Sequence, residues 1–176
     1  MSNASELNLE SGQVDEDMMQ NPGNQYLTFT LANEGYGVNI LRVEEIRGLD
    51  NWTRIPNSPP FVRGVVNIRG AIVPVIDLRE RFELGGCEYS NDAVIIVLRG
   101  ETNLGSRALG IVADAVSDVH DAERAAFGVT PEFGSGVNTE FISGLATVDG
   151  RMVMLLDVER ILNHKDVCGA DEKAAA

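Results

Sequence analysis

Lysine is nearly absent from this 176-residue chain, in which 12 of the 14 basic residues are arginine and the two lysines, Lys165 and Lys173, lie near the C-terminus. Long apolar runs are missing too. The longest, such as AVIIVL and AIVPVI, are far shorter than the ~20 residues that a membrane-spanning helix needs. The N-terminus lacks the positive charge and the apolar run of a signal peptide. We therefore expect a cytoplasmic protein with no direct membrane insertion.

Residues that commonly carry chemistry are equally scarce. Cys87 and Cys168 are far apart and belong to no CxxC or cysteine–histidine pattern, so we predict neither a disulfide nor a metal site. Nothing in the sequence pairs His120 or His164 with a nucleophile. A phosphate-binding GxxxxGK[ST] loop and a dinucleotide-binding GxGxxG fingerprint are also absent. These absences predict no catalytic residues, no cofactor and no metal.

The charge balance excludes another class of partner. The formal net charge is −13 and only 6% of the residues are aromatic, so the surface should repel nucleic-acid phosphates and offers few rings for stacking on bases. Arginine as the main cation fits fixed contacts, because its planar guanidinium donates in a rigid fork, but drift in composition explains the bias about as well. The hydrophobic fraction of 44% permits a sizeable core.

Composition divides the chain into three parts. Residues 1–24 are polar and acidic without a basic residue, which predicts a disordered leader, and residues 164–176 read as a flexible or short-helical tail. Between them, runs such as YLTFTLA, AVIIVLR and RMVMLLDV alternate with Gly- and Asn-rich turns, a pattern typical of an all-β barrel or sandwich. Short helices are expected only within ILRVEEI, DLRERF and DVERILN, the last two starting at the N-cap residues Asp77 and Asp157.

The central part contains an internal repeat. FVRGVVNIRGAIVPVIDLRERF, which begins at Phe61, aligns without a gap with FISGLATVDGRMVMLLDVERIL, which begins at Phe141, at a constant offset of 80 residues. Upstream, GVNILRVEEI resembles GIVADAVSDV. Each copy is too short to bury much surface alone. We therefore expect two small β-units that share one core.

The repeat also marks one turn as unusual. Asp149 and Gly150 of the second copy form a common tight-hairpin pair, whereas the first copy keeps Gly70 but has Arg69 before it. The turn itself does not require an arginine. The sequence leaves two interpretations open, a solvated surface residue and a residue that contacts a partner.

Several stretches resemble the CheW family of bacterial chemotaxis coupling proteins. They are YLTFTLANEGYGVNILRVEEIRG, TRIPNSPPFVRGVVNIRGAIVPVIDLRERF, GIVADAVSDV and TEFISGLATVDGRMVMLLDVERIL, which span about residues 25–163 in the family's order. The resemblance implies an all-β fold of two intertwined five-stranded SH3-like barrels sharing a core, with a few short helices. It also implies a non-catalytic adaptor that couples the cytoplasmic tips of methyl-accepting chemoreceptors to the regulatory domain of a CheA-type histidine kinase.

The resemblance also assigns roles to residues. Receptor binding falls on Val43, Glu45, Gly64, Asn67 and Arg69, and kinase binding on an apolar face of the first barrel and on a patch of the second. That patch contains Glu132 and Phe133. It implies a protein that is monomeric when free and is recruited to membrane-associated receptor arrays.

Two alternatives remain open at this point. The chain could couple a different chemosensory array, for instance one that governs surface motility. A more distant alternative is a small β-barrel enzyme or ligand sensor that uses Cys87 or His120, which would require a deep pocket with convergent polar groups.

Overall fold

The computed structural model describes residues 24–49, 52–85, 88–121, 140–165 and 167. Ten strands make up most of this part of the chain, and the prediction of an all-β fold is confirmed. The strands are β1 (Gln25–Leu31), β2 (Glu34–Asn39), β3 (Val43–Gly48), β4 (Val62–Ile68), β5 (Ala71–Ile76), β6 (Val94–Thr102), β7 (Gly105–Ala113), β8 (Ala115–Asp121), β9 (Ile142–Val148) and β10 (Arg151–Leu156). The helices are η2 (Ile40–Arg42), α2 (Leu78–Arg81) and α3 (Val158–Leu162).

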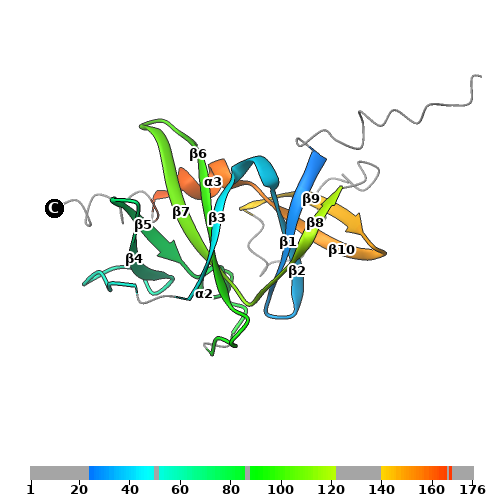
Figure 1. Ribbon diagram of the computed structural model, residues 1–176, viewed down its shortest axis with the longest axis horizontal. Helices are drawn as coiled ribbons and strands as arrows, with labels where there is room; N and C mark the ends of the chain where they lie inside the picture. The colour runs from blue at the N-terminus through cyan, green and yellow to red at the C-terminus, as the bar shows by residue number, and fades with distance from the viewer. Residues whose placement is uncertain (1–23, 50–51, 86–87, 122–139, 166, 168–176) are drawn as a thin grey trace, which may run out of the picture.

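The strands form two five-stranded sheets, which lie at opposite ends of the molecule (Figure 1). The sheet with the order β8-β1-β2-β10-β9 is called barrel A here, and the sheet with the order β3-β6-β7-β5-β4 is called barrel B. Each sheet therefore combines strands from both copies of the repeat. If β1 to β5 correspond to β6 to β10, the two strand orders are identical. The first two strands of each copy therefore lie in the barrel that contains the last three strands of the other copy.

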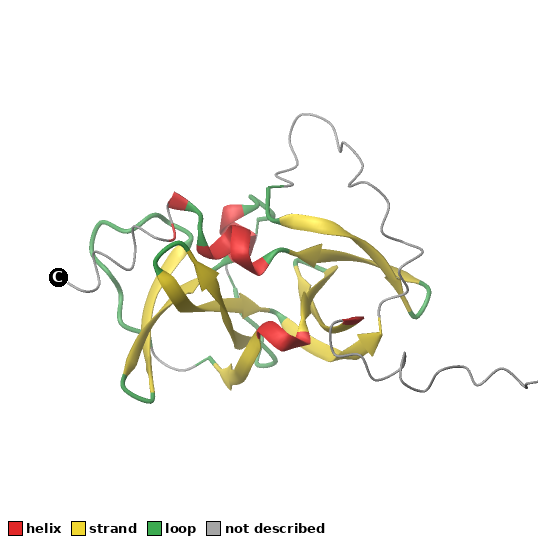
Figure 2. Ribbon diagram, turned by 90° about the horizontal axis from the view of Figure 1, so that it is seen from above, coloured by secondary structure: helices red, strands yellow, loops and turns green. Residues whose placement is uncertain are grey.

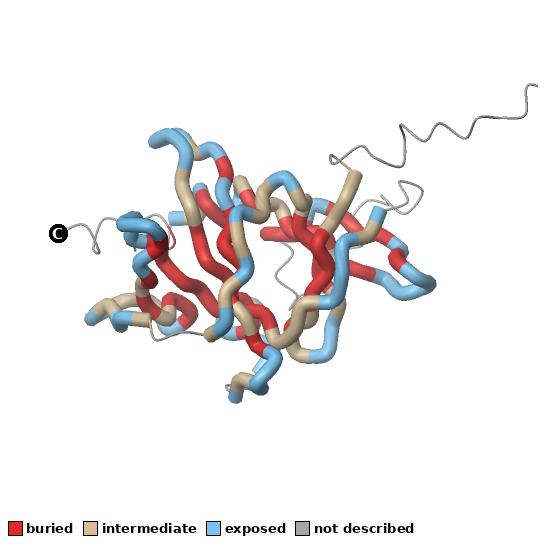
Figure 3. Tube along the Cα trace, in the orientation of Figure 1, coloured by how far each residue is buried: buried red, intermediate tan, exposed pale blue. Residues whose placement is uncertain are grey.

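A core shared by both barrels holds this exchanged arrangement together. Its largest cluster of buried side chains draws on β1, β6, β7 and both α2 and α3, and includes Phe29, Leu98, Ile111 and Phe141. The buried segments run through the middle of the molecule, whereas hairpin tips are exposed (Figure 3). Two smaller clusters fill the individual barrels, one around Val97 in barrel B and one of four residues in barrel A. The expected shared core is confirmed.

The two predicted helix caps are present. Asp77 accepts a hydrogen bond from the backbone N–H of Arg79 at the start of α2, and Asp157 accepts one from Arg160 at the start of α3. Each cap also donates its own backbone N–H to the phenylalanine that opens its repeat copy, Phe61 or Phe141. The short helices lie near the middle of the molecule (Figure 2).

The stretch ILRVEEI is mostly not helical. Only Ile40–Arg42 forms a turn of 3-10 helix, which the side chain of Asn39 caps, and from Val43 onward the chain is strand β3. Half-buried and exposed residues alternate along β3, with Glu45 and Arg47 on the same face. Pairing with the long, buried β6 therefore overrides the weak helical pattern.

The packed part of the chain continues beyond the boundary expected at residue 163. Val167 is 3% exposed and belongs to the shared core, and the His164 ring packs edge-on against Phe141. The start of the expected tail therefore covers one side of the core. Among the described residues, no helix is long and apolar enough to cross a membrane.

Candidate functional site

Strands β3 and β4 are the two outer strands of the barrel B sheet, and polar side chains join them. The Arg69 guanidinium lies 3.2 Å from Glu45 Oε2, and Arg47 Nη1 donates to the Asn67 backbone carbonyl at 3.3 Å. These contacts close the barrel between strands that share no backbone ladder. They bring together Glu45, Asn67 and Arg69, three of the five residues assigned to receptor binding.

The turn between β4 and β5 presents Arg69 on a defined backbone. Arg69 and Gly70 both have positive φ, 53° and 87°, as a two-residue hairpin turn of the primed type requires. The Asn67 side chain accepts a hydrogen bond from the Gly70 N–H at 2.9 Å and fixes the turn. The Arg69 side chain remains 79% exposed, so most of its guanidinium donors face solvent. It is therefore accessible to a partner although one carboxylate already contacts it.

The equivalent turn of barrel A carries the opposite charge. Asp149 and Gly150 also have positive φ, 49° and 75°, close to the values of Arg69 and Gly70. Asp149 Oδ2 lies 3.5 Å from Nδ1 of His120 on β8, the strand that corresponds to β3. Both barrels thus have a polar side-chain contact between the turn and the corresponding outer strand, with an acidic residue on the turn of barrel A and a basic residue on the turn of barrel B. The backbone of the turn tolerates either residue, so the turn geometry does not explain the arginine.

Gly64 does not belong to the exposed group. It is buried, and a Cβ at this position would lie 2.2 Å from the backbone oxygen of Thr53. Its φ of 154° is also one that other residues rarely adopt. The chain itself therefore makes a close approach at Gly64, and the glycine is needed for local packing. Receptor contact at Gly64 stays a prediction.

Val43 is only half-buried at the start of β3. Its side chain packs against the shared core rather than against Arg69. The outward-facing residues of β3 are Glu44 and Ile46 instead, and Glu44 forms a two-pronged contact with Arg99 of β6. Val43 therefore contributes to the position of β3 next to the Glu45–Arg69 pair.

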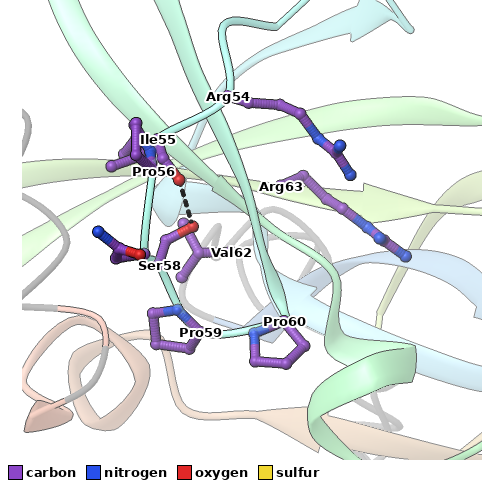
Figure 4. Close-up of a pocket in the computed structure, with 9 residues that line it drawn as sticks. Arg54, Ile55, Pro56, Ser58, Pro59, Pro60, Val62 and Arg63 are labelled. Atoms are coloured by element: carbon purple, nitrogen blue, oxygen red, sulfur yellow. Dashed lines mark hydrogen bonds between the residues drawn. The ribbon is translucent and has the colours of Figure 1, made fainter.

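A proline-rich loop runs along the free edge of β4. Thr53 and Val65 exchange two backbone hydrogen bonds of 2.9 and 2.8 Å. The loop encloses a cavity of about 340 Å³, where the Arg54 and Arg63 side chains extend side by side (Figure 4). The Ser58 hydroxyl donates to the Ile55 carbonyl and stiffens the loop. Because Arg63 also pairs with Asp77, this cavity is not a strongly cationic site.

A buried polar cluster, which the sequence analysis did not find, lies behind this loop. It consists of Arg63, Asp77, Arg79, Tyr89 and Asp114. The Tyr89 hydroxyl donates to Asp77 and accepts from Arg63. Burial, followed by the hydrogen bond and the charge of Asp77, raises the pKa of Tyr89 to about 12, so the phenol stays protonated at neutral pH. The second copy has Ser143 and Glu159 in place of Arg63 and Arg79, and this difference was the sequence signal available for the cluster.

The remaining sequence-predicted residues fall into two groups. Glu132, Phe133, Cys87 and Cys168 lie outside the described residues. His120 lies beside a cavity of about 530 Å³ at the mouth of barrel A, together with Asp149. No group of three or more histidine, cysteine, aspartate or glutamate side chains in the described ranges is arranged to hold a metal ion.

Comparison with known proteins gives consistent matches. The family model for the CheW-like domain matches residues 25–166. The chain is 45% identical to the chemotaxis protein CheW of Klebsiella aerogenes over 152 residues, which cover 86% of this chain and 89% of that protein. It is 32% identical to the chemotaxis protein CheW of Rhizobium meliloti, covering 84% and 93%. The crystal structure of the scaffolding protein TtCheW from Thermoanaerobacter tengcongensis superposes with a TM-score of 0.71 at 30% identity, covering 82% and 90%.

Proposed function

The chain belongs to the CheW-like family and is a chemotaxis coupling adaptor, and we propose that it links the cytoplasmic tips of chemoreceptors to a CheA-type histidine kinase without catalysing a reaction. The kinase and the receptors are proposed partners, as is recruitment of a cytoplasmic, monomeric protein to receptor arrays. An adaptor of this kind needs rigid, accessible contact residues rather than a reactive group.

One observation supports the proposed location of the receptor surface. Arg69 is 79% exposed on a fixed turn, next to Glu45 and Asn67, although the same turn in barrel A is built with Asp149. We assign receptor docking to this surface, which is called the Arg69 surface from here on and consists of Glu45, Asn67 and Arg69. Arginine is among the side chains enriched at interface positions whose loss costs 2 kcal/mol or more, that is, about 30-fold in affinity.

The other assigned residues support this surface or serve the kinase. For Val43 and Gly64, which the resemblance also assigns to receptor binding, we propose a supporting role through packing, because both are less exposed than Arg69. Kinase binding is assigned to Glu132 and Phe133 by the family resemblance. Coupling in a different chemosensory array would use the same surface with other receptors.

The experiment is kinase autophosphorylation in a reconstituted mixture of receptor cytoplasmic fragment, CheA-type kinase and this chain. The native chain should activate the kinase, and Arg69→Glu should abolish most of this activation while direct binding to the kinase persists. Asp149→Asn, on the equivalent turn of barrel A, is the matched control and should activate normally. A native chain that neither binds the kinase nor activates it would contradict the proposed partners.

A further inference from the structure

The buried polar cluster has a composition that its position in the fold does not require. Asp77 is 0% exposed and Arg79 is 5% exposed. Asp77 accepts hydrogen bonds from the Arg79 backbone, the Arg63 guanidinium and the Tyr89 hydroxyl. Burying charges is costly unless each is paired and hydrogen-bonded, so this cluster needs a physical explanation.

The second copy of the repeat shows that the fold forms without this cluster. At the offset of 80, Ser143 occupies the position of Arg63, and Glu159 occupies the position of Arg79. Asp157 still caps α3 there, with its side chain 26% exposed. A capped helix after the hairpin therefore needs the aspartate but neither of the two arginines. The additional residues serve something found only in the first copy.

Tyr89 connects the cluster to the loop that lies along β4. Its ring stands edge-on to Trp52 with a centroid distance of 6.1 Å and an interplanar angle of 86°. The Arg79 guanidinium covers the Tyr89 ring at 4.8 Å from the centroid. Trp52 and Tyr89 both pack against the side-chain cluster that fills barrel B. The tyrosine is thus held through its hydroxyl at one end and positions the indole with its ring.

Trp52 in turn lies against the strand that carries the Arg69 surface. Its Cδ1 would be 3.1 Å from a Cβ at Gly64, and the next residue, Thr53, is bonded to Val65 through both backbone groups. Asn67, two residues beyond Val65, fixes the Arg69 turn through Gly70. A continuous series of contacts therefore runs from the buried cluster to the turn.

The cluster also reaches the other barrel. Arg79 Nη1 donates to Asp114 Oδ1 at 2.8 Å, and Asp114 Oδ2 accepts from the backbone N–H of Ala32 in the β1–β2 turn at 2.8 Å. Asp114 stands between β7 of barrel B and β8 of barrel A. The cluster that holds the loop is therefore bonded to both barrels.

We propose that Tyr89 is a positioning residue of the Arg69 surface: anchored by Asp77 and Arg63, it holds Trp52 against β4 and so fixes the turn that docks the receptor. The expected effect on receptor affinity rests on the proposed function, whereas the expected effect on the Arg69 turn does not. Tyr89 makes no receptor contact in this scheme.

Tyr89→Phe tests the proposal, because it removes the hydroxyl and keeps the ring on Trp52. Amide hydrogen exchange at Val65 and Gly70 should become about tenfold faster, while exchange in barrel A stays unchanged. Affinity for a receptor cytoplasmic fragment should fall at least threefold, and affinity for the kinase regulatory domain should stay native. Tyr36→Phe, which alters a buried tyrosine of barrel A, is the matched control and should leave exchange at Val65 and Gly70, receptor affinity and kinase affinity unchanged.

A second control separates positioning from general stability. Asp157→Ala removes the cap of α3 and should lower global stability without affecting exchange at Val65 or Gly70. If Tyr89→Phe behaves like Asp157→Ala, with native exchange at Val65 and Gly70, Tyr89 is only a stabilising residue and the proposal is wrong. If Arg69→Glu leaves receptor affinity unchanged, the proposed docking surface is wrong, whereas the exchange data still decide whether Tyr89 positions the turn.

Discussion

Gly64→Ala adds a side chain at the position where the Thr53 backbone lies against β4. The new Cβ would lie 2.2 Å from the Thr53 oxygen, which is a backbone atom and cannot rotate away. The loop must therefore leave β4, and the alanine must also hold a φ of 154° that it rarely adopts. The substitution adds only one methyl group and no charge, so its effect reports on packing.

The structure sets the magnitude of this effect. Displacing the loop breaks both Thr53–Val65 hydrogen bonds, which contribute about 0.5–1.5 kcal/mol each. Holding alanine in the unfavourable backbone conformation adds about 1–3 kcal/mol. Together these terms predict that the unfolding free energy falls by roughly 2–6 kcal/mol. Gly70→Ala should cost only about 1–2 kcal/mol, because its positive φ is strained but nothing lies within 4 Å of the added methyl.

Urea unfolding followed by Trp52 fluorescence measures both variants. The Gly64→Ala midpoint should fall well below that of Gly70→Ala, and receptor affinity should fall along with loop attachment. A Gly64→Ala protein as stable as the Gly70→Ala protein would refute the argument that Thr53 excludes a side chain.

Three further predictions concern the buried charges, the tyrosines and the charge of the Arg69 turn. Arg79→Met removes the cation 3.6 Å from the buried Asp77 carboxylate and the hydrogen-bond donor to Asp114, and should lower the unfolding free energy by about 3–5 kcal/mol. Arg160→Met, at a 60% exposed side chain, should cost under about 1 kcal/mol in the same urea titration. Burial raises the pKa of both Tyr36 and Tyr89 to about 12, whereas the unfolded chain loses these protons near pH 10. The unfolding free energy should therefore fall between pH 10 and 12, by about 1.4 kcal/mol per pH unit for each tyrosine. The double variant Tyr36→Phe/Tyr89→Phe should flatten this part of the stability profile, and a native profile already flat there would contradict it. Arg69→Asp, which installs the residue that barrel A uses at this turn, should leave the unfolding free energy within about 1 kcal/mol of native and should still weaken receptor binding.

The repeat in the sequence predicted two related β-units but not how they combine. Both copies contain the same order of five strands, and that order is compatible with two separate barrels as well as with exchanged ones. The choice depends on which buried faces meet, and the pairing of β3 with β6 or of β10 with β2 is not encoded in either segment alone. The exchanged arrangement was expected only because of the family resemblance.

The candidate site was predictable where local chemistry determines it. Arg69 and Gly70 stand at a hairpin position that the comparison with Asp149 and Gly150 singles out, and the structure places them in a turn of the expected geometry. For Gly64, the sequence indicates a close approach but does not say which atom makes it. That atom is the Thr53 oxygen, 11 residues earlier in the chain.

The buried cluster was missed for a different reason. Its members Arg63, Tyr89 and Asp114 come from three separate segments, and each reads alone as an ordinary surface residue. Only the tertiary fold brings them around Asp77. The second copy carries serine at 143 and glutamate at 159, and this asymmetry is the one sequence feature that points to the cluster.

The central claim is that the Arg69 surface binds chemoreceptors directly, and a charge-swap binding measurement tests it. The affinity of a receptor cytoplasmic fragment is measured for the native chain, for Arg69→Glu and for the double variant Arg69→Glu/Glu45→Arg, which reverses the 3.2 Å ion pair while retaining it. The account predicts at least tenfold weaker binding for Arg69→Glu and no recovery in the double variant, because the receptor interacts directly with the positive charge at the turn. Native affinity in Arg69→Glu, or full recovery in the double variant, would contradict the claim and leave the arginine with only the closure of barrel B.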